Sequence, residues 1–181
     1  MNPINSINPM NPTNMPALGR KIGFLGCLLL AGCAALAACE PAEREITLTV
    51  LDSGTQCGGP ADGAGAEWIG RPDRLRQMPK RPAMPGSSQE YPWDPQVEGL
   101  LWIHMGTQPT GGYRLELAAP TAQVRNGVAV VQVRWREPAP GSFVTQALTS
   151  PCLLLKMPKA GIKRVDIKDQ NDRLRLQVAP K

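Results

Sequence analysis

The chain has 181 residues, which is enough for a targeting segment followed by one domain with a single hydrophobic core. Its 20 Lys and Arg residues against 15 Asp and Glu give a net charge of +5, and part of that excess, Arg20 and Lys21, precedes every acidic residue. The later chain is therefore only mildly basic, which argues against nucleic-acid binding, and its one histidine, His104, excludes a metal site of several histidines.

A targeting segment is expected in residues 1–39. A low-complexity stretch rich in Asn and Pro comes first, and the basic pair Arg20-Lys21 is followed by uncharged, mostly apolar residues up to Cys39. This is the pattern of a signal peptide, and translation from Met15 would give it a lead of ordinary length. The apolar run also reaches the lower length limit of a membrane-spanning helix, so an uncut anchor is the alternative.

Two tetrads in this run, Leu30–Cys33 and Leu36–Cys39, have the Leu-small-small-Cys pattern of the bacterial lipobox. In that motif a diacylglycerol is added to the cysteine sulfur and the chain is cut just before the cysteine. Cys39 is the preferred lipidation site because cleavage there leaves a polar start, and Cys33 is the alternative because it leaves a shorter apolar run. Several acyl chains attach a protein stably to a membrane. The sequence thus predicts a lipid-anchored protein of the bacterial envelope that faces the periplasm or the cell exterior.

Residues 40–181 have the pattern of a single β-rich domain. Short runs of alternating apolar and polar residues are separated by turns rich in Gly and Pro, and Asn126-Gly127 predicts a tight hairpin. Pro72–Met78 predicts a short helix, and residues 79–96 a long Pro-rich loop. Expected strands cover 46–51, 66–69, 100–105 (a central strand), 113–117, 129–136, 143–149, 153–157, 165–167 and 174–178. Together they predict an antiparallel β-sandwich or an open barrel-like domain with one or two short helices.

Two cysteines, Cys57 and Cys152, lie outside the targeting segment. In an oxidising compartment such a pair either forms a disulfide or remains as two separate buried thiols, and the sequence leaves both outcomes open. A disulfide would close a loop of about 95 residues and stabilise the domain by up to ~4 kcal/mol.

No residue pattern predicts an enzyme. His104 has no second histidine, acid cluster or Ser or Cys nucleophile motif beside it, so we interpret it as a core residue rather than a base or ligand. The scattered acidic residues show no pairing by spacing: Asp52, Asp94, Glu98, Glu116 and Asp166. We therefore expect no catalytic residues, no cofactor and no metal, and nothing in the sequence names a small-molecule ligand.

Several segments of the second half occur in a recognisable order. They are the octad Gly106–Tyr113, the turn Pro138–Gly141, the segment Val144–Pro151 and the apolar strand Leu153–Pro158. With them, residues 101–158 resemble the C-terminal domain of the protease complex subunit PrcB family. The resemblance implies a small β domain of bacterial envelope lipoproteins, named for the non-catalytic subunit of a surface protease complex. It implies a protein-binding or assembly module whose partner is an envelope protein or a protease.

The candidate binding loop lies within the octad and consists of Gln108, Pro109, Thr110, Gly111, Gly112 and Tyr113. The proline fixes φ and the glycines permit positive φ, so the loop is either a docking loop or only a tight turn between strands. The same residues resemble the Asn-Pro-Thr-Thr-Gly-Tyr loop of chagasin-like cysteine-protease inhibitors. Inhibition of a protease is therefore the alternative function, although the other two loops of that family are not found in this sequence.

Overall fold

The computed structural model describes residues 43–58, 63–78 and 91–180. The chain divides into two units, Met1–Ala38 and Cys39–Lys181, and every described residue belongs to the second. The targeting segment with Cys33 and Cys39, and most of the Pro-rich loop, lie outside the described residues. Among the helices of the described part, none combines the length and apolar character needed to cross a membrane.

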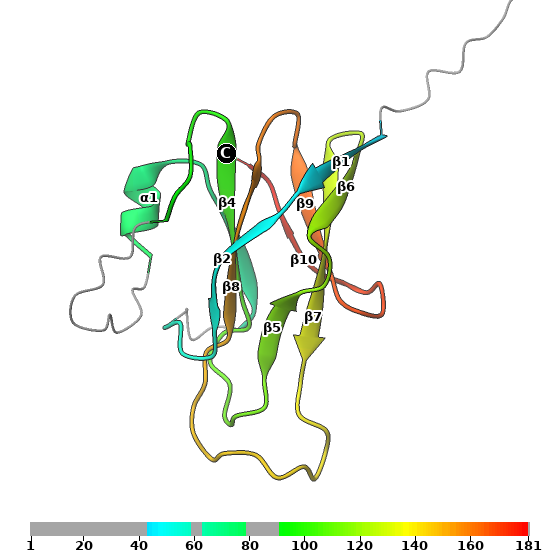
Figure 1. Ribbon diagram of the computed structural model, residues 1–181. Helices are drawn as coiled ribbons and strands as arrows, with labels where there is room; N and C mark the ends of the chain where they lie inside the picture. Colours follow the sequence, from blue (N-terminus) through cyan, green and yellow to red (C-terminus); the bar gives the residue numbers. More distant parts are fainter. Residues whose placement is uncertain (1–42, 59–62, 79–90, 181) are drawn as a thin grey trace, which may run out of the picture. The chain divides into compact units, whose positions relative to one another are not determined.

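One sheet has four strands in the order β2-β8-β4-β3, and all of its pairings are antiparallel. Its members are β2 (Thr49–Gly54), β8 (Cys152–Pro158), β4 (Glu98–His104) and β3 (Gly65–Ile69). Both faces of β4 are buried, as expected for a central strand. Figure 1 shows this sheet beside the short helix α1 (Pro72–Arg76), which is shorter than the predicted span of 72–78.

The second sheet has six strands (Figure 1). The main path is β1-β6-β7-β9-β10, and β5 pairs with the C-terminal part of β7, residues 133–136. The pairings are antiparallel except that β7 and β9 run parallel, so the antiparallel character predicted for the domain is confirmed apart from this one pair. The strands are β1 (Glu43–Thr47), β5 (Arg114–Leu117), β6 (Thr121–Arg125), β7 (Val128–Arg136), β9 (Arg164–Lys168) and β10 (Leu174–Val178).

A tight turn at Asn126-Gly127 joins β6 to β7, as predicted. Asn126 has φ +54° and Gly127 has φ +81°, and positive φ at both central positions is the requirement of a type I′ hairpin turn. β5 and β6 follow one edge of β7 in succession, with an interruption at residues 118–120. The long hairpin thus supplies the central part of the six-stranded sheet.

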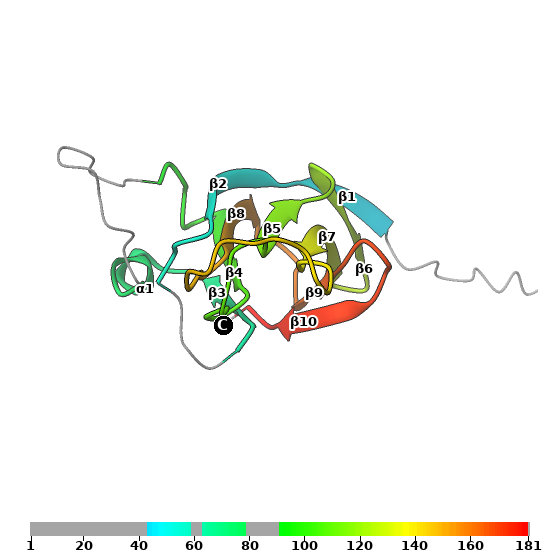
Figure 2. The same cartoon turned by 90° about the horizontal axis from the view of Figure 1, so that it is seen from below.

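The first two strands carry the chain from one sheet to the other. β1 pairs with β6 and β2 pairs with β8, and the buried Leu48 lies between them and donates its N–H to the carbonyl of Pro120 (2.8 Å). Figure 2 shows the two sheets viewed along the strands. At the remaining sheet edges β2 lies against β5 and β10 against β3, but neither contact is a hydrogen-bonded pairing. The sheets therefore face each other without forming a closed barrel.

The main core lies between the two sheets. The inward residues of β7 alternate with outward ones, and Val131 and Val133 are fully buried against residues such as Leu101 and Leu155 of the opposite sheet. A second apolar cluster covers the other face of the four-stranded sheet, where Trp102 and neighbouring residues pack beneath α1 and the segment around Trp93. The strand faces that carry the apolar residues are thus the faces that are buried.

One predicted strand is wrong. Residues 143–149 form no strand, and apart from an isolated bridge of Thr149 to Gln108 they belong to a long loop between β7 and β8. Phe143 and Leu148, two large apolar residues of this segment, are exposed. The backbone groups of this segment bond to a distant loop instead of to a neighbouring strand, as described below.

Candidate functional site

The octad forms the loop that connects β4 to β5. After β4 the chain passes through Gly106, whose φ is +73° and where a Cβ would collide with the backbone of Gly63. Farther along, the Gln108 side chain closes the first part of the loop by donating from Nε2 to the Met105 carbonyl (2.7 Å). Glycine is required at the start of the octad because of this close approach of two backbones.

A second loop, between β7 and β8, holds the octad in place. Gln108 and Thr149 exchange two backbone hydrogen bonds (2.7 and 3.0 Å), and the Gly111 N–H donates to the Thr145 carbonyl (2.8 Å). The Thr149 hydroxyl donates to the carbonyl of Thr110 (2.8 Å). The N–H groups of Gln108 and Gly111, which could have met a partner's backbone, are thus used within the protein. We call residues 108–113 and 138–149 together the two-loop surface.

The end of the octad fixes the entry into β5. Gly112 has φ +90°, and a Cβ there would approach Val144 Cγ1 (3.0 Å) and Pro138 Cβ (3.1 Å) of the second loop. The Thr110 hydroxyl donates locally to the Gly111 carbonyl (3.1 Å), and Tyr113 packs partly buried against the main core. The six candidate residues therefore lie in one loop whose shape depends on the second loop.

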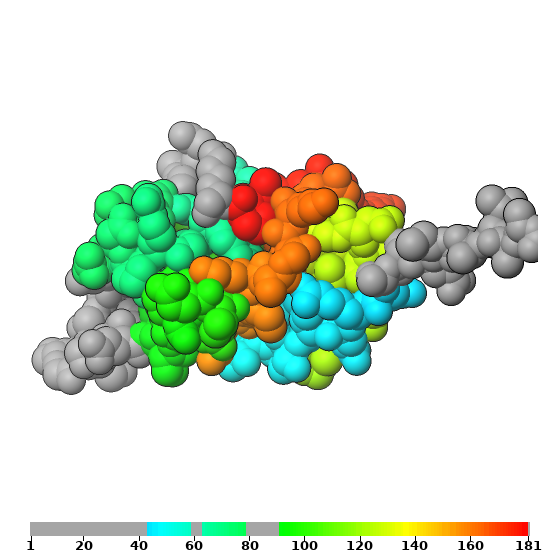
Figure 3. Space-filling view, turned by 90° about the horizontal axis from the view of Figure 1, so that it is seen from above, coloured from blue at the N-terminus to red at the C-terminus, as the bar shows by residue number. Residues whose placement is uncertain are grey.

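The two-loop surface presents apolar side chains to solvent. Phe143 is fully exposed and Leu148 is two-thirds exposed, although both belong to a loop that is bonded to the octad. This exposed pair was not anticipated from the sequence, because residues 143–149 were expected in a strand. Figure 3 shows the other end of the domain, where the segment before β4 and the turn after β8 gather.

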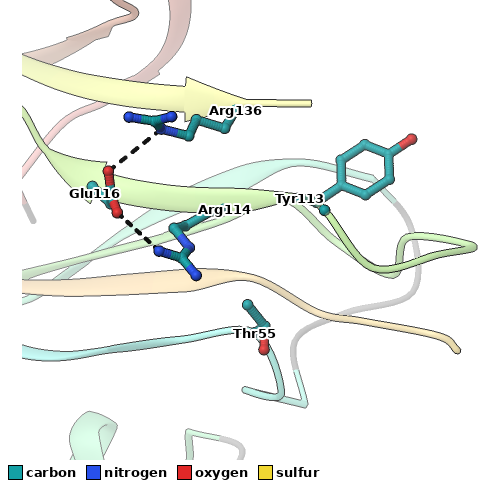
Figure 4. A pocket seen from close by; sticks show the side chains of 6 residues that line it. Thr55, Tyr113, Arg114, Glu116 and Arg136 are labelled. Carbon is teal, nitrogen blue, oxygen red and sulfur yellow. Dashed lines mark hydrogen bonds and ion pairs between the residues drawn. The ribbon is translucent and has the colours of Figure 1, made fainter. Parts of the chain in front are cut away.

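A pocket of about 350 Å³ adjoins the two-loop surface, lined by Thr55 after β2, by Gly112 and Tyr113, and by charged residues of β5 and β7. Glu116 lies between two guanidinium groups (Figure 4), with carboxylate oxygens 3.3 Å from Arg114 Nη1 and 3.5 Å from Arg136 Nε. All three side chains are at least partly exposed. The pocket is therefore polar and open to solvent, and it offers guanidinium donors at its rim.

His104 lies away from this pocket, at the end of β4 and beside the second apolar cluster. Its ring is tilted against Trp102 with the ring centroids 4.7 Å apart, and its Nδ1 atom is buried without a hydrogen-bond partner among residues that the structure describes. Burial lowers the pKa of His104, while Glu67 and a hydrogen bond with the Gly63 backbone oppose that shift. Neither feature brings a nucleophile to the histidine.

Cys57 and Cys152 are joined by a disulfide in the structure, with their Cα atoms 5.9 Å apart. Cys152 begins β8 and stands opposite His104 in the register with β4. Across the described ranges, no group of three His, Cys, Asp or Glu residues is arranged to hold a metal ion. The disulfide links the chain after β2 to the start of the strand beside it.

Comparison with protein families gives one match: residues 100–158 fit the model described as PrcB C-terminal. This confirms the resemblance predicted for residues 101–158, and the matched segment includes the octad, β5 to β7, the second loop and β8. No curated protein and no solved structure matches the chain.

Proposed function

We propose that the protein is a non-catalytic, lipid-anchored component of the bacterial envelope that binds another envelope protein through the two-loop surface. The observation that carries the proposal is the fully exposed Phe143 on a loop whose backbone is held in place by the octad. Water does not favour large exposed apolar groups, and aromatic and Arg side chains are enriched where proteins meet. Both kinds of residue stand at this end of the domain.

The family match gives the partner a class. Since residues 100–158 fit the PrcB C-terminal model, a protein of a protease-related complex is the partner we propose. The lipid anchor rests on the two Leu-small-small-Cys tetrads that end at Cys33 and Cys39. In this proposal the anchor places the domain at the membrane and the two-loop surface supplies the specific contact.

The test is a pull-down of the tagged full chain from native membranes in mild detergent, followed by mass spectrometry. Phe143→Ser is compared with Val97→Ser, which changes another exposed apolar residue, located before β4. We expect the wild type and Val97→Ser to retain the same envelope protein and Phe143→Ser to lose it, with all three equally stable. Equal retention by Phe143→Ser would refute the proposal. Inhibition of a papain-type protease that is lost in Gly112→Val would favour the inhibitor alternative instead.

A further inference from the structure

The pocket beside the two-loop surface has an excess of positive charge. Arg114 and Arg136 stand opposite each other in the register of β5 and β7, and they share one carboxylate, that of Glu116. The two arginine side chains are 63% and 61% exposed, whereas Glu116 is 33% exposed. A guanidinium group has five N–H donors, so most donors of the pair face solvent. The cluster is therefore suited to accept a second anion.

The pocket continues into the two-loop surface. Gly112 and Tyr113 line the pocket and belong to that surface, which also carries the exposed side chains of Phe143 and Leu148. In the described part of the molecule the edges of β5 and β2 lie against each other without a hydrogen-bonded pairing, too close for a further strand to enter between them. A partner segment is therefore held here through its side chains rather than through an added backbone ladder.

We infer that this pocket binds a carboxylate of an extended partner segment, while an apolar side chain of the same segment rests on Phe143 and Leu148. The inference rests on the proposed function and adds the chemistry of the partner. Arginine pairs a carboxylate through two parallel N–H donors, so two partly unused guanidinium groups favour an acidic over a neutral side chain. The pocket volume, about 350 Å³, is at the low end for ligand sites, so the pocket takes one side chain of the segment and not the whole segment.

Substitutions of the three charged residues should change the affinity for an acidic segment in opposite directions. Arg114→Gln and Arg136→Gln remove donors and should weaken binding of an acidic segment. Glu116→Gln removes the carboxylate that competes for the same donors and should strengthen it. If the cluster only stabilised the sheet, all three changes would act in the same direction. Arg125→Gln is the matched control, because Arg125 is exposed on β6 of the same sheet and does not line the pocket.

The probe is an array of synthetic heptapeptides that each contain one Glu and one Phe or Leu, paired with counterparts in which Gln replaces Glu. The full chain is applied in detergent micelles, and its melting temperature is measured for each variant. We expect retention on Glu peptides over their Gln counterparts. The affinity should fall about tenfold in each Arg variant and rise in Glu116→Gln, and it should weaken as salt is added. Arg125→Gln should bind as the wild type does.

Equal retention on Glu and Gln peptides, or no retention on any peptide, would overturn the inference. Binding to vesicles of phosphatidylglycerol that needs Arg114 and Arg136, without peptide binding, would overturn it in favour of an anionic lipid surface. The failure of this inference can be distinguished from the failure of the proposed function by the pull-down from membranes. If Phe143→Ser loses the membrane partner while the Arg and Glu116 variants keep it unchanged, the two-loop surface binds a protein but the carboxylate inference is wrong.

Discussion

Gly112 occupies a position where both conformation and space exclude a side chain. Its φ is +90°, and a Cβ would press on Val144 and Pro138, which belong to the second loop. Positive φ alone costs about 1–2 kcal/mol for a residue with a Cβ. We expect Gly112→Val to lower the melting temperature by several degrees, because ~1 kcal/mol shifts a domain of this size by a few degrees.

Gly141→Val is the matched control for this change. Gly141 also has positive φ, +77°, but a Cβ there would meet no atom within 4 Å. Thermal unfolding followed by circular dichroism should show a smaller loss for Gly141→Val than for Gly112→Val. Equal losses would mean that the contact between the two loops contributes nothing to stability.

The pH dependence of stability should report on His104. Burial lowers its pKa in the folded state, so the unfolded chain binds a proton more readily. The contribution of neutral His104 to stability is therefore fully present above the ordinary histidine pKa of about 6.5, and it decreases as the pH falls below that value. Urea unfolding between pH 5 and 8 should show this decrease in the wild type, and His104→Gln should reduce it. An unchanged slope in His104→Gln would contradict the assignment to this side chain.

At the level of elements, the β9–β10 hairpin depends on one buried carboxylate. Asp169 is fully buried and accepts the N–H groups of Asn171 (2.8 Å) and Arg173 (3.1 Å) and the Arg175 Nε (2.7 Å). Burial raises its pKa, but these hydrogen bonds and the charge of Arg175 outweigh burial, and the pKa lies below its ordinary value. The carboxylate therefore stabilises the fold above the ordinary Asp pKa, and this contribution is lost as the pH falls through the lower, folded-state value.

We expect Asp169→Ala to destabilise the protein by about 3 kcal/mol, because it leaves buried N–H donors and the Arg175 charge without their acceptor. Asp172→Ala is the control in the same turn, since Asp172 is exposed. Its own hydrogen bond with Gln132 lies at the surface. Denaturant unfolding at neutral pH should separate the two variants clearly. A loss of the same size in both would show that the turn conformation matters more than the buried carboxylate.

How much of the fold the sequence predicted depends on how local each element is. The hairpin at Asn126-Gly127 and the alternation of β7 were predicted, because turn chemistry and burial periodicity act over a few residues. The loop at 143–149 was mistaken for a strand because its backbone bonds go to the octad, far away in sequence. The residue types of a short segment hold no information about such a partner.

The candidate site was predicted in part for the same reason. The octad is contiguous, so its six residues could be identified from the sequence. The pocket could not be predicted from the sequence, because a regular β-ladder continued from the hairpin turn would place Glu116 opposite Glu137. The interruption at 118–120 shifts the register and sets Glu116 opposite Arg134, with Arg114 opposite Arg136. Only the three-dimensional pairing brings the three charges together.

For the whole molecule, the prediction concerns how the chain is attached. The two tetrads predict a mature chain that starts at Cys39 or Cys33 and carries acyl groups. Intact-mass measurement of protein extracted from membranes should give either start plus the acyl mass. Cys39→Ala should retain lipidation if Cys33 serves as the second site, whereas changing both cysteines should abolish it. A soluble form that begins at Met1 or Met15 without acyl mass would contradict the prediction.

The path of β1 and β2 has a consequence for the order in which the chain folds. These strands come first in the domain, but their partners β6 and β8 follow roughly 80 to 110 residues later. An emerging chain has no local partner for its first strands, so the four-stranded sheet is complete only after β8 has been synthesised and the six-stranded sheet only after β10. Non-local strand pairing is slow, on the order of milliseconds to seconds. β1 and β2 therefore remain unpaired until most of the chain has been made, because each pairs with a strand far later in the sequence.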